Sequence, residues 1–151
     1  MRKTYPARGR DAEVVRAYSL ASDPHSAELL EIALDRVEGG PGSGYLFSLR
    51  VGAGIDFTGP WGTFVLPVPP PPSSVFIAEN TGVAPLRPMV RAALASSEVR
   101  DLQLLHAAAD EASLLYRSEF ERWAREDARF RFETLIEGSG SHEALFGLVR
   151  R

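Results

Sequence analysis

Two groups of residues in this chain have the types and spacing that bind phosphate-bearing ligands. The first is a polar loop, Glu79-Asn80-Thr81-Gly82, between the apolar run Val75-Phe76-Ile77-Ala78 and a helical pattern over residues 86–94. We expect a strand, a turn and a helix, with Pro85 and Pro88 in the first helical turn, where proline is tolerated. In a parallel sheet such a turn faces the ligand, and the free N–H groups of the helix can bind an anion.

The second group lies in the first third of the chain. Arg16-Ala17-Tyr18-Ser19 combines a guanidinium, which binds phosphate through two parallel hydrogen bonds, with a phenol that offers a flat stacking face. Gly40-Pro41-Gly42-Ser43 follows, and Ser43 could cap a helical turn at 45–49. The alternative interpretation is an edge strand and glycine-rich hairpins of an unrelated β domain.

Taken in order, these motifs resemble the ferredoxin-NADP reductase superfamily, the flavin reductases that include oxygenase reductase components. Thr81-Gly82-Val83-Ala84-Pro85 is similar to its pyridine-nucleotide turn, and Arg16-Ala17-Tyr18-Ser19 to its flavin-binding strand. Gly59-Pro60-Trp61-Gly62 resembles the turn that ends its flavin barrel, and residues 114–120 resemble a helix of its nucleotide domain. The resemblance runs from about residue 14 to about residue 135, so it implies a member shortened at both ends.

The resemblance implies a role for each motif residue. Arg16 would pair with a flavin phosphate, Tyr18 would lie against the isoalloxazine, and Ser19 would hydrogen-bond near its reactive ring nitrogen, which makes Tyr18 and Ser19 the implied catalytic residues. The remaining implied cofactor-binding residues are Gly40, Gly42 and Ser43 for the flavin phosphates, and Thr81, Gly82 and Pro85 for the nicotinamide nucleotide. The implied cofactors are FAD or FMN together with NAD(P)H.

Three positions depart from the family pattern at the nucleotide site. Glu79 and Asn80 stand where the usual loop has two glycines, and Ala109 stands where many relatives have a phosphate-binding arginine. A carboxylate ~4 Å from a pyrophosphate oxygen costs about 1 kcal/mol in water and about 4 kcal/mol at an effective dielectric constant of 20. Asn80 also fills space that a backbone needs for close approach to phosphate. These departures favour a weakened nucleotide site.

The expected fold class is α/β, with a partial antiparallel β-barrel of the flavin type followed by a small three-stranded parallel nucleotide-binding sheet. The expected domains are a partial flavin-binding β domain at 1–66, a proline-rich linker at 67–74 and a truncated α/β nucleotide-binding domain at 75–151. Residues 1–12 read as a loose arm. The predicted strands are 14–20, 29–37, 55–58, 75–78, 102–106 and 130–133, and the predicted helices are 86–94, 113–125 and 143–149.

Composition excludes several classes of function. The net charge of −3 and the pI near 5.6 give no basic surface for nucleic acid or an anionic membrane. The absence of cysteine excludes thiolate metal sites and cysteine nucleophiles. His25, His106 and His142 are far apart, so we expect no metal site, and a packed His106 is favoured over a catalytic one. No apolar run reaches eighteen residues, which predicts a cytoplasmic protein.

The sequence supports more than one function. The first hypothesis is a flavin-dependent oxidoreductase that transfers electrons between NAD(P)H and an acceptor, which could be a protein. The second is a shortened, catalytically impaired flavin- or nucleotide-binding module that acts with a protein partner, and the third is a partner-dependent subunit with no cofactor. An open half-barrel exposes strand edges, which predicts a homo-oligomer such as a dimer.

Overall fold

The computed structural model of the chain describes residues 2–7, 10–23 and 29–136. By its internal contacts the chain forms two compact units, and each is described by itself. Unit 1 comprises Met1–Ser19 and Ala33–Phe64, and unit 2 comprises Leu20–Ile32 and Val65–Arg151. The predicted closing helix at 143–149 lies outside the described residues.

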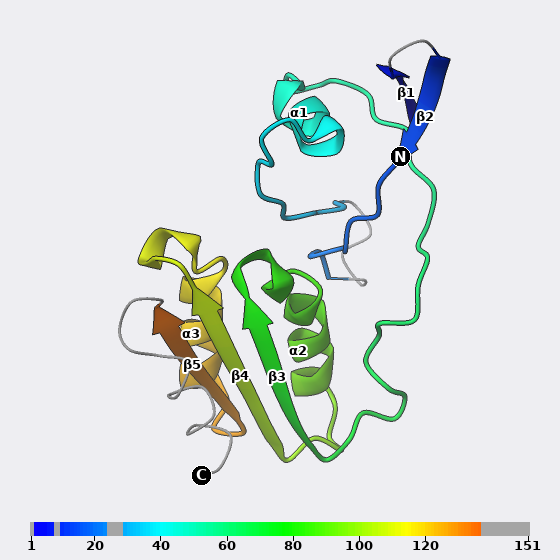
Figure 1. Cartoon of the computed structure of the whole chain (residues 1–151). Helices are drawn as coiled ribbons and strands as arrows, with labels where there is room; N and C mark the ends of the chain where they lie inside the picture. The colour runs from blue at the N-terminus through cyan, green and yellow to red at the C-terminus, as the bar shows by residue number, and fades with distance from the viewer. Residues whose placement is uncertain (1, 8–9, 24–28, 137–151) are drawn as a thin grey trace. The chain divides into compact units, whose positions relative to one another are not determined.

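Unit 2 is built on a three-stranded parallel sheet (Figure 1). Its strands are β3 (Ser73–Glu79), β4 (Asp101–Ala108) and β5 (Phe130–Ile136), in the order β3-β4-β5. Phe76 pairs with Leu104, which in turn pairs with Phe132. The predicted strand–helix alternation and parallel pairing are therefore confirmed for the described part of this unit.

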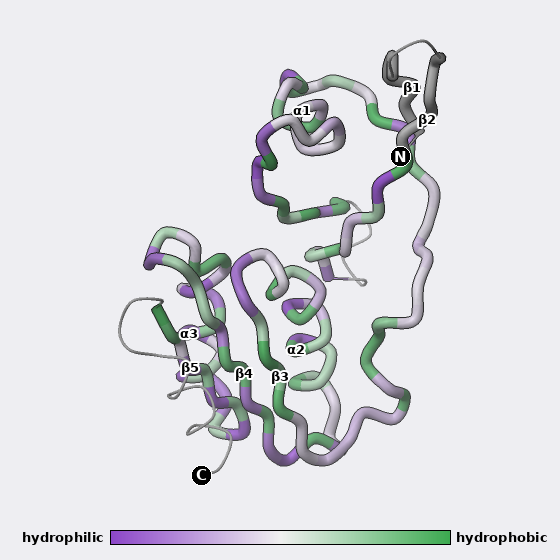
Figure 2. The backbone as a smooth tube through the Cα atoms, viewed as in Figure 1, coloured by the Kyte–Doolittle hydropathy of each residue, from purple (hydrophilic) through white to green (hydrophobic). Residues whose placement is uncertain are grey.

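Two helices, α2 (Leu86–Ala95) and α3 (Arg117–Glu126), pack on one face of this sheet. The core comes from alternate strand residues and the apolar stripes of both helices. Its buried members are Ala78, Val83, Leu86, Met89, Val90, Ala93, Val99, Leu102, Leu104, Phe120, Trp123 and Phe130. Figure 2 shows the run of hydrophobic residues along β3, one face of which contributes to this core. On the other face Val75 and Ile77 are about half exposed, at 50% and 51%.

The predicted helix at 113–125 is corrected in its first turn. Residues Glu111–Ser113 form a separate 3-10 turn, in which the Asp110 side chain accepts a hydrogen bond from the N–H of Ser113. Tyr116 then adopts a left-handed conformation, with φ +60°, and α3 begins at Arg117. Phe120 and Trp123 of the predicted aromatic face lie in the core, with ring centroids 5.4 Å apart and nearly perpendicular planes.

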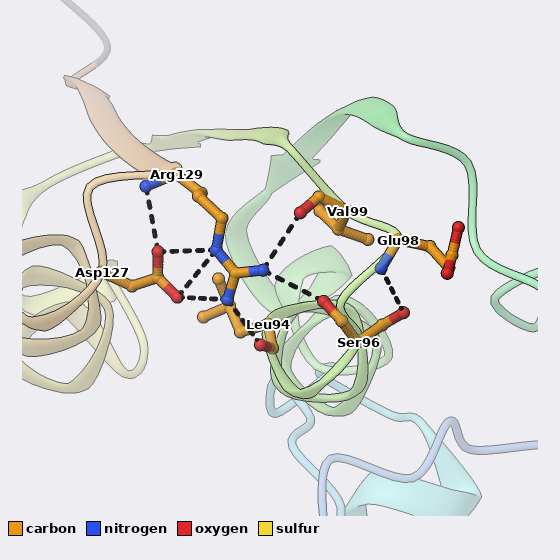
Figure 3. Close-up of polar contacts among 6 residues, drawn as sticks. All are labelled: Leu94, Ser96, Glu98, Val99, Asp127 and Arg129. Carbon is orange, nitrogen blue, oxygen red and sulfur yellow. Dashed lines mark hydrogen bonds and ion pairs between the residues drawn. The ribbon is translucent and has the colours of Figure 1, made fainter.

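Arg129 closes the carboxyl end of α2 (Figure 3). Its guanidinium donates to the carbonyl oxygens of Leu94 at 2.8 Å, Ser96 at 3.0 Å and Val99 at 3.0 Å. Asp127 holds the guanidinium from the other side, with a shortest N–O distance of 2.6 Å. Because the last carbonyls of a helix have no intrahelical partner, this arginine supplies donors that the helix end needs.

Unit 1 contains the antiparallel pair β1 (Arg2–Ala7) and β2 (Arg10–Val15) and the helix α1 (Pro41–Ser48). The prediction of a loose arm at 1–12 is wrong, because most of it forms this hairpin. The predicted strand at 14–20 ends at Val15, and the strands predicted at 29–37 and 55–58 have no ladder, apart from a single bridge between Leu20 and Ile32. A strand needs a neighbour for its N–H and C=O groups, which alternating side chains alone do not supply. The flavin-type barrel stays a prediction.

Candidate cofactor-binding site

The turn after β3 keeps a backbone conformation that glycine normally provides. Asn80 has φ +46°, in the left-handed region, where asparagine is tolerated better than other non-glycine residues. Its side-chain oxygen accepts a hydrogen bond from the N–H of Ala109 at 3.3 Å, at the end of β4. The asparagine that stands at a glycine position therefore preserves the turn and links the carboxyl ends of two neighbouring strands.

His106 of β4 hydrogen-bonds to the backbone of the same turn. Its side chain is fully buried, and Nε2 donates to the carbonyl oxygen of Asn80 at 3.0 Å, which requires the proton to be on Nε2. Burial lowers the pKa of His106, and the bond to the Asn80 carbonyl only partly offsets this effect. Among the residues that the structure describes, Nδ1 has no hydrogen-bond partner. A neutral, packed histidine agrees with the sequence-based interpretation.

The remainder of the turn is open at Gly82 and leads into the first turn of α2. Asn80–Val83 forms a short 3-10 turn, and a Cβ built on Gly82 would meet no atom within 4 Å. Pro85 lies at the N-cap of α2 and Pro88 lies in its first turn, as predicted. The first-turn N–H groups of α2 that have no intrahelical partner can bind an anion there. Glu79 is exposed at the end of β3.

In unit 1 the structure brings the predicted flavin residues together. A Cβ on Gly42 would lie 2.6 Å from the Tyr18 hydroxyl and 3.1 Å from Cγ of Arg16, so only glycine allows both side chains to pack on the first turn of α1. Arg16 itself is exposed. Its Cβ and Cγ lie beside the first turn of α1, and its guanidinium donates to the carbonyl oxygen of Val15 at 2.9 Å. An exposed guanidinium and the free N–H groups of a helix N-terminus are both groups that bind phosphate. These residues therefore fit the phosphate of a flavin nucleotide.

Ser43 has a different local role from the predicted helix cap. Gly40 is the N-cap of α1, and Ser43 lies inside the first turn and is buried. Its Oγ accepts a hydrogen bond from the N–H of Val37 at 3.0 Å and donates to the carbonyl oxygen of Val37 at 3.2 Å. The hydroxyl therefore ties the preceding chain to the helix. Its implied contact with a phosphate, like that of Ser19 with the flavin ring, stays a prediction.

Sequence reasoning missed one polar cluster of unit 2, formed by Arg87, Glu31, Glu119, Tyr116 and the carbonyl of Ala21. Arg87 donates to Glu119 at 2.6 Å, to Glu31 at 2.7 Å and to the carbonyl oxygen of Ala21 at 3.0 Å. Its guanidinium also lies 4.4 Å from the centroid of the Tyr116 ring. These partners are up to 66 residues from Arg87 in sequence, so no local pattern could have predicted them.

The hydrogen bonds of this cluster shift the pKa values of Glu31, Tyr116 and Arg87. Burial raises the pKa of Glu31, but hydrogen bonds from Tyr116 and Arg87 outweigh it and hold that pKa below its usual value. Burial and the bond to Glu31, which accepts from the Tyr116 hydroxyl at 2.7 Å, raise the pKa of Tyr116 to about 12. Burial opposes the charge of Arg87, yet Glu119 and Glu31 together raise its pKa. Near neutral pH, Arg87 and Glu31 therefore form a charged pair, and the Tyr116 hydroxyl keeps its proton and donates it to Glu31.

Comparison with known protein families gives two matches, one after the other along the chain. Residues 4–66 match the family described as Oxidoreductase FAD-binding domain, and residues 76–145 match Oxidoreductase NAD-binding domain. These matches define a protein with a flavin-binding part followed by a nicotinamide-nucleotide-binding part. Among the described residues, none of the helices combines the length and the apolar composition that a membrane span requires.

Individual relatives agree with this class. The chain is 42% identical over 139 residues to ferredoxin–NADP reductase B of Sorangium cellulosum, covering 91% of this chain and 57% of that one. The crystal structure of a cytochrome P450 reductase of Amycolatopsis is 35% identical, with a TM-score of 0.69, over 85% of this chain and 40% of that one. The cytochrome b5 reductase domain of Ulva prolifera nitrate reductase, at 24% identity and a TM-score of 0.74 over 93% of this chain and 61% of that one, shows the shared fold.

The chain belongs to the ferredoxin reductase-like superfamily. The predicted resemblance is thus confirmed, and so is the pairing of FAD with a nicotinamide nucleotide at the level of the two domain families. The chain spans 57% of the length of its Sorangium relative and 34% of the length of a phenol hydroxylase P5 protein of Acinetobacter pittii.

Proposed function

We propose that this chain is a flavin-dependent oxidoreductase that takes electrons from NAD(P)H and passes them to an acceptor. The observation that carries the proposal is the turn after β3. Asn80 holds it in a glycine-like conformation, with φ +46°, and the space at Gly82 is open. The departure from glycine at Asn80 therefore keeps a glycine-like backbone at the turn.

The chain's own residues bind and orient in this proposal. The Arg16 guanidinium and the first-turn N–H groups of α1 hold the flavin phosphates, Tyr18 stacks on the ring system, and Ser19 hydrogen-bonds at its edge. Thr81, Gly82 and Pro85 hold the nucleotide beside α2. A flavin held by these residues would supply the two-electron chemistry that the side chains lack, between hydride from a reduced nicotinamide and an electron acceptor.

The experiment that tests the proposal uses the full chain incubated with FAD and desalted. Retention of the visible flavin bands, followed by their bleaching when NADH or NADPH is added without oxygen, is the expected result. Retained flavin that neither nucleotide bleaches would contradict the proposal and favour the impaired binding module.

A matched pair of variants on α1 tests the flavin site. A side chain at Gly42 would collide with Tyr18, whereas a Cβ at Gly44 would meet nothing within 4 Å. We expect Gly42→Val to weaken FAD binding by about tenfold or more, because overpacking costs about 1–3 kcal/mol. Gly44→Val should bind FAD as the wild type does. Equal affinities for the two variants would count against flavin binding at this place.

The second candidate, an impaired binding module, is favoured by one observation. Glu79 places an exposed carboxylate at the turn where the nucleotide pyrophosphate is expected. Nucleotide binding without flavin reduction would support this candidate.

We extend the proposal to partners and domain limits. A protein acceptor is supported by a structural relative described as a cytochrome P450 reductase. We assign flavin binding to 1–66 and nucleotide binding to 75–151, joined by 67–74, and we expect self-association through unpaired edges of the flavin part. Size-exclusion chromatography of the FAD-loaded chain tests this last point, and a monomer would contradict it.

A further inference from the structure

The nucleotide turn of unit 2 is bonded to the segment that follows β4. The side-chain oxygen of Asn80 accepts a hydrogen bond from the N–H of Ala109 at 3.3 Å, and in the sheet Glu79 pairs with Ala107. Asp110 comes directly after Ala109, so its Cα lies ~3.8 Å from the Cα of a residue that is bonded to the turn. Asp110 therefore borders the same edge of the sheet as the nucleotide turn.

The carboxylate of Asp110 is exposed but held in place. It accepts a hydrogen bond from the N–H of Ser113 at 2.8 Å, which makes Asp110 the N-cap of the 3-10 turn Glu111–Ser113. Bonds from the side chain and the backbone of Ser113 lower the pKa of Asp110, so the group is ionised near neutral pH. Because a carboxylate has about four acceptor positions, it can accept a further hydrogen bond from a ligand.

Two arginines that are close to this edge along the chain are already paired. Arg117 is the first basic residue after Asp110, and it pairs with two glutamates at 2.7 Å each. Arg87, in the first turn of α2, likewise pairs with two glutamates, at 2.6 and 2.7 Å. A phosphate group at this edge would have to compete with carboxylates for either guanidinium.

The two nicotinamide nucleotides differ in one group. NADPH carries a phosphate on the 2′-oxygen of its adenosine ribose, where NADH carries a hydroxyl. In dinucleotide-binding α/β sheets the pyrophosphate lies at a helix N-terminus, and an acidic residue further along the chain accepts a hydrogen bond from the ribose 2′-hydroxyl. A carboxylate in that position repels a phosphate monoester, whose charge is about −1.5 to −2 at neutral pH.

We propose that the nucleotide site selects NADH over NADPH, and that Asp110 discriminates between them by accepting a hydrogen bond from the ribose 2′-hydroxyl and repelling a 2′-phosphate. This inference rests on the proposed function and names the nucleotide that it uses. Glu79 acts differently, because it borders the turn expected to bind the pyrophosphate, which both nucleotides share. The repulsion from Glu79 weakens both nucleotides alike, whereas the repulsion from Asp110 separates them.

The test measures the binding of NAD⁺ and NADP⁺ to the full, FAD-loaded chain by calorimetry at low ionic strength. Two unit charges ~4 Å apart in water change an affinity by a factor of about five, and the phosphate carries nearly two charges. We therefore expect wild type to bind NAD⁺ roughly ten- to twentyfold more tightly than NADP⁺. This ratio should shrink several-fold in about 1 M NaCl, where the Debye length is about 3 Å.

Asp110→Asn is the decisive variant, because asparagine caps a helical turn as well as aspartate does and removes only the charge. We expect it to bind NADP⁺ at least about fivefold more tightly than wild type does, with the Kd for NAD⁺ within about threefold. If this variant does not fold, Asp110→Ser, which can also cap, should show the same shift.

Two other carboxylates serve as controls. Glu79→Gly should tighten the binding of both nucleotides by a similar factor and leave their ratio unchanged. Glu98→Gln removes an exposed carboxylate from the loop before β4, at the opposite end of that strand, and should leave both affinities unchanged.

The possible failures are distinguishable. A wild-type chain that binds neither nucleotide, or whose flavin neither NADH nor NADPH reduces, would overturn the proposed function together with this inference. A reducible chain that binds NADP⁺ as tightly as NAD⁺, or more tightly, would overturn the inference alone. A preference for NAD⁺ that persists unchanged in Asp110→Asn and Asp110→Ser, or in about 1 M NaCl, would overturn the electrostatic role of Asp110.

Discussion

Substitution of Asn80 is the sharpest test of how the nucleotide turn is built. Asn80 contributes in two ways, through a backbone with φ +46° and through a side-chain bond of 3.3 Å to the N–H of Ala109. Asn80→Ala loses both, because alanine is disfavoured in the left-handed region by about 1–2 kcal/mol and cannot make the bond. Asn80→Gly keeps the conformation and loses only the bond.

The expected magnitudes follow from these two contributions. The exposed hydrogen bond is worth about 0.5 kcal/mol, the low end of the usual range. Glycine also raises the conformational entropy of the unfolded chain, which lowers the free energy of unfolding by about 0.5 kcal/mol. We therefore expect the free energy of unfolding to fall by about 1 kcal/mol for Asn80→Gly and by about 2 kcal/mol for Asn80→Ala. Glu79→Ala, at an exposed and extended neighbour with φ −125°, should change it by less than about 0.5 kcal/mol.

Urea unfolding followed by Trp123 fluorescence measures these differences within unit 2. Trp123 is 8% exposed in its core, whereas Trp61 is 84% exposed in unit 1, so a Trp61→Phe background isolates the signal. An Asn80→Ala variant as stable as Asn80→Gly would refute the claim that asparagine stabilises the turn by tolerating the left-handed backbone conformation. Nucleotide binding should survive in Asn80→Gly, since the turn is unchanged.

Three further predictions concern the same unit. Glu79→Gly should bind NADH about fivefold more tightly, as expected from removing about 1 kcal/mol of repulsion at an exposed carboxylate, and an unchanged calorimetric Kd would exclude that repulsion. Because burial lowers the pKa of His106, the unfolded chain takes up the proton first, so stability should decline as pH falls below the usual value of about 6.5. His106→Gln should remove that decline, which urea titrations at pH 7 and 5.5 measure. An equal loss of unfolding free energy between these pH values in wild type and variant would contradict the prediction. Arg129→Lys should lower the urea midpoint clearly more than Arg131→Lys. A lysine ammonium at position 129 cannot hydrogen-bond to all three carbonyls and to Asp127, whereas Arg131 pairs only with the exposed Asp101 in the contacts described here.

The sequence predicted unit 2 better than unit 1 because its signals are local. The apolar run before Glu79, the prolines of α2 and the alternation around Phe130 each specify an element within a few residues. The segments at 29–37 and 55–58, which lie wholly or partly in unit 1, have strand-like side chains, but a ladder depends on neighbours that no local pattern specifies. The same limit applies to the Arg87–Glu31 pair, which joins residues 56 positions apart.

The structure adds local contacts for two of the predicted site residues, whose roles toward a cofactor stay predictions. Gly42 was expected to hold a phosphate, and the structure adds that its missing side chain is what admits Tyr18 and Arg16 to the first turn of α1. Ser43 was expected to offer its hydroxyl to a phosphate, and the structure adds that this hydroxyl bonds the backbone of Val37. A motif identifies positions, while the partner of each hydrogen bond depends on the surrounding chain.

The choice between an active oxidoreductase and an impaired module now depends on fewer residues than the sequence suggested. Asn80 no longer counts against nucleotide binding, because it occupies the conformation that glycine would and directs its side chain to Ala109 at the end of β4. Ala109 thereby has a structural partner for its N–H, although it supplies no cation. Glu79 is left as the one charge that opposes a pyrophosphate at this turn, and since it is exposed, water screens its repulsion to about 1 kcal/mol. A penalty of that size weakens binding several-fold but does not abolish it, which favours the active enzyme.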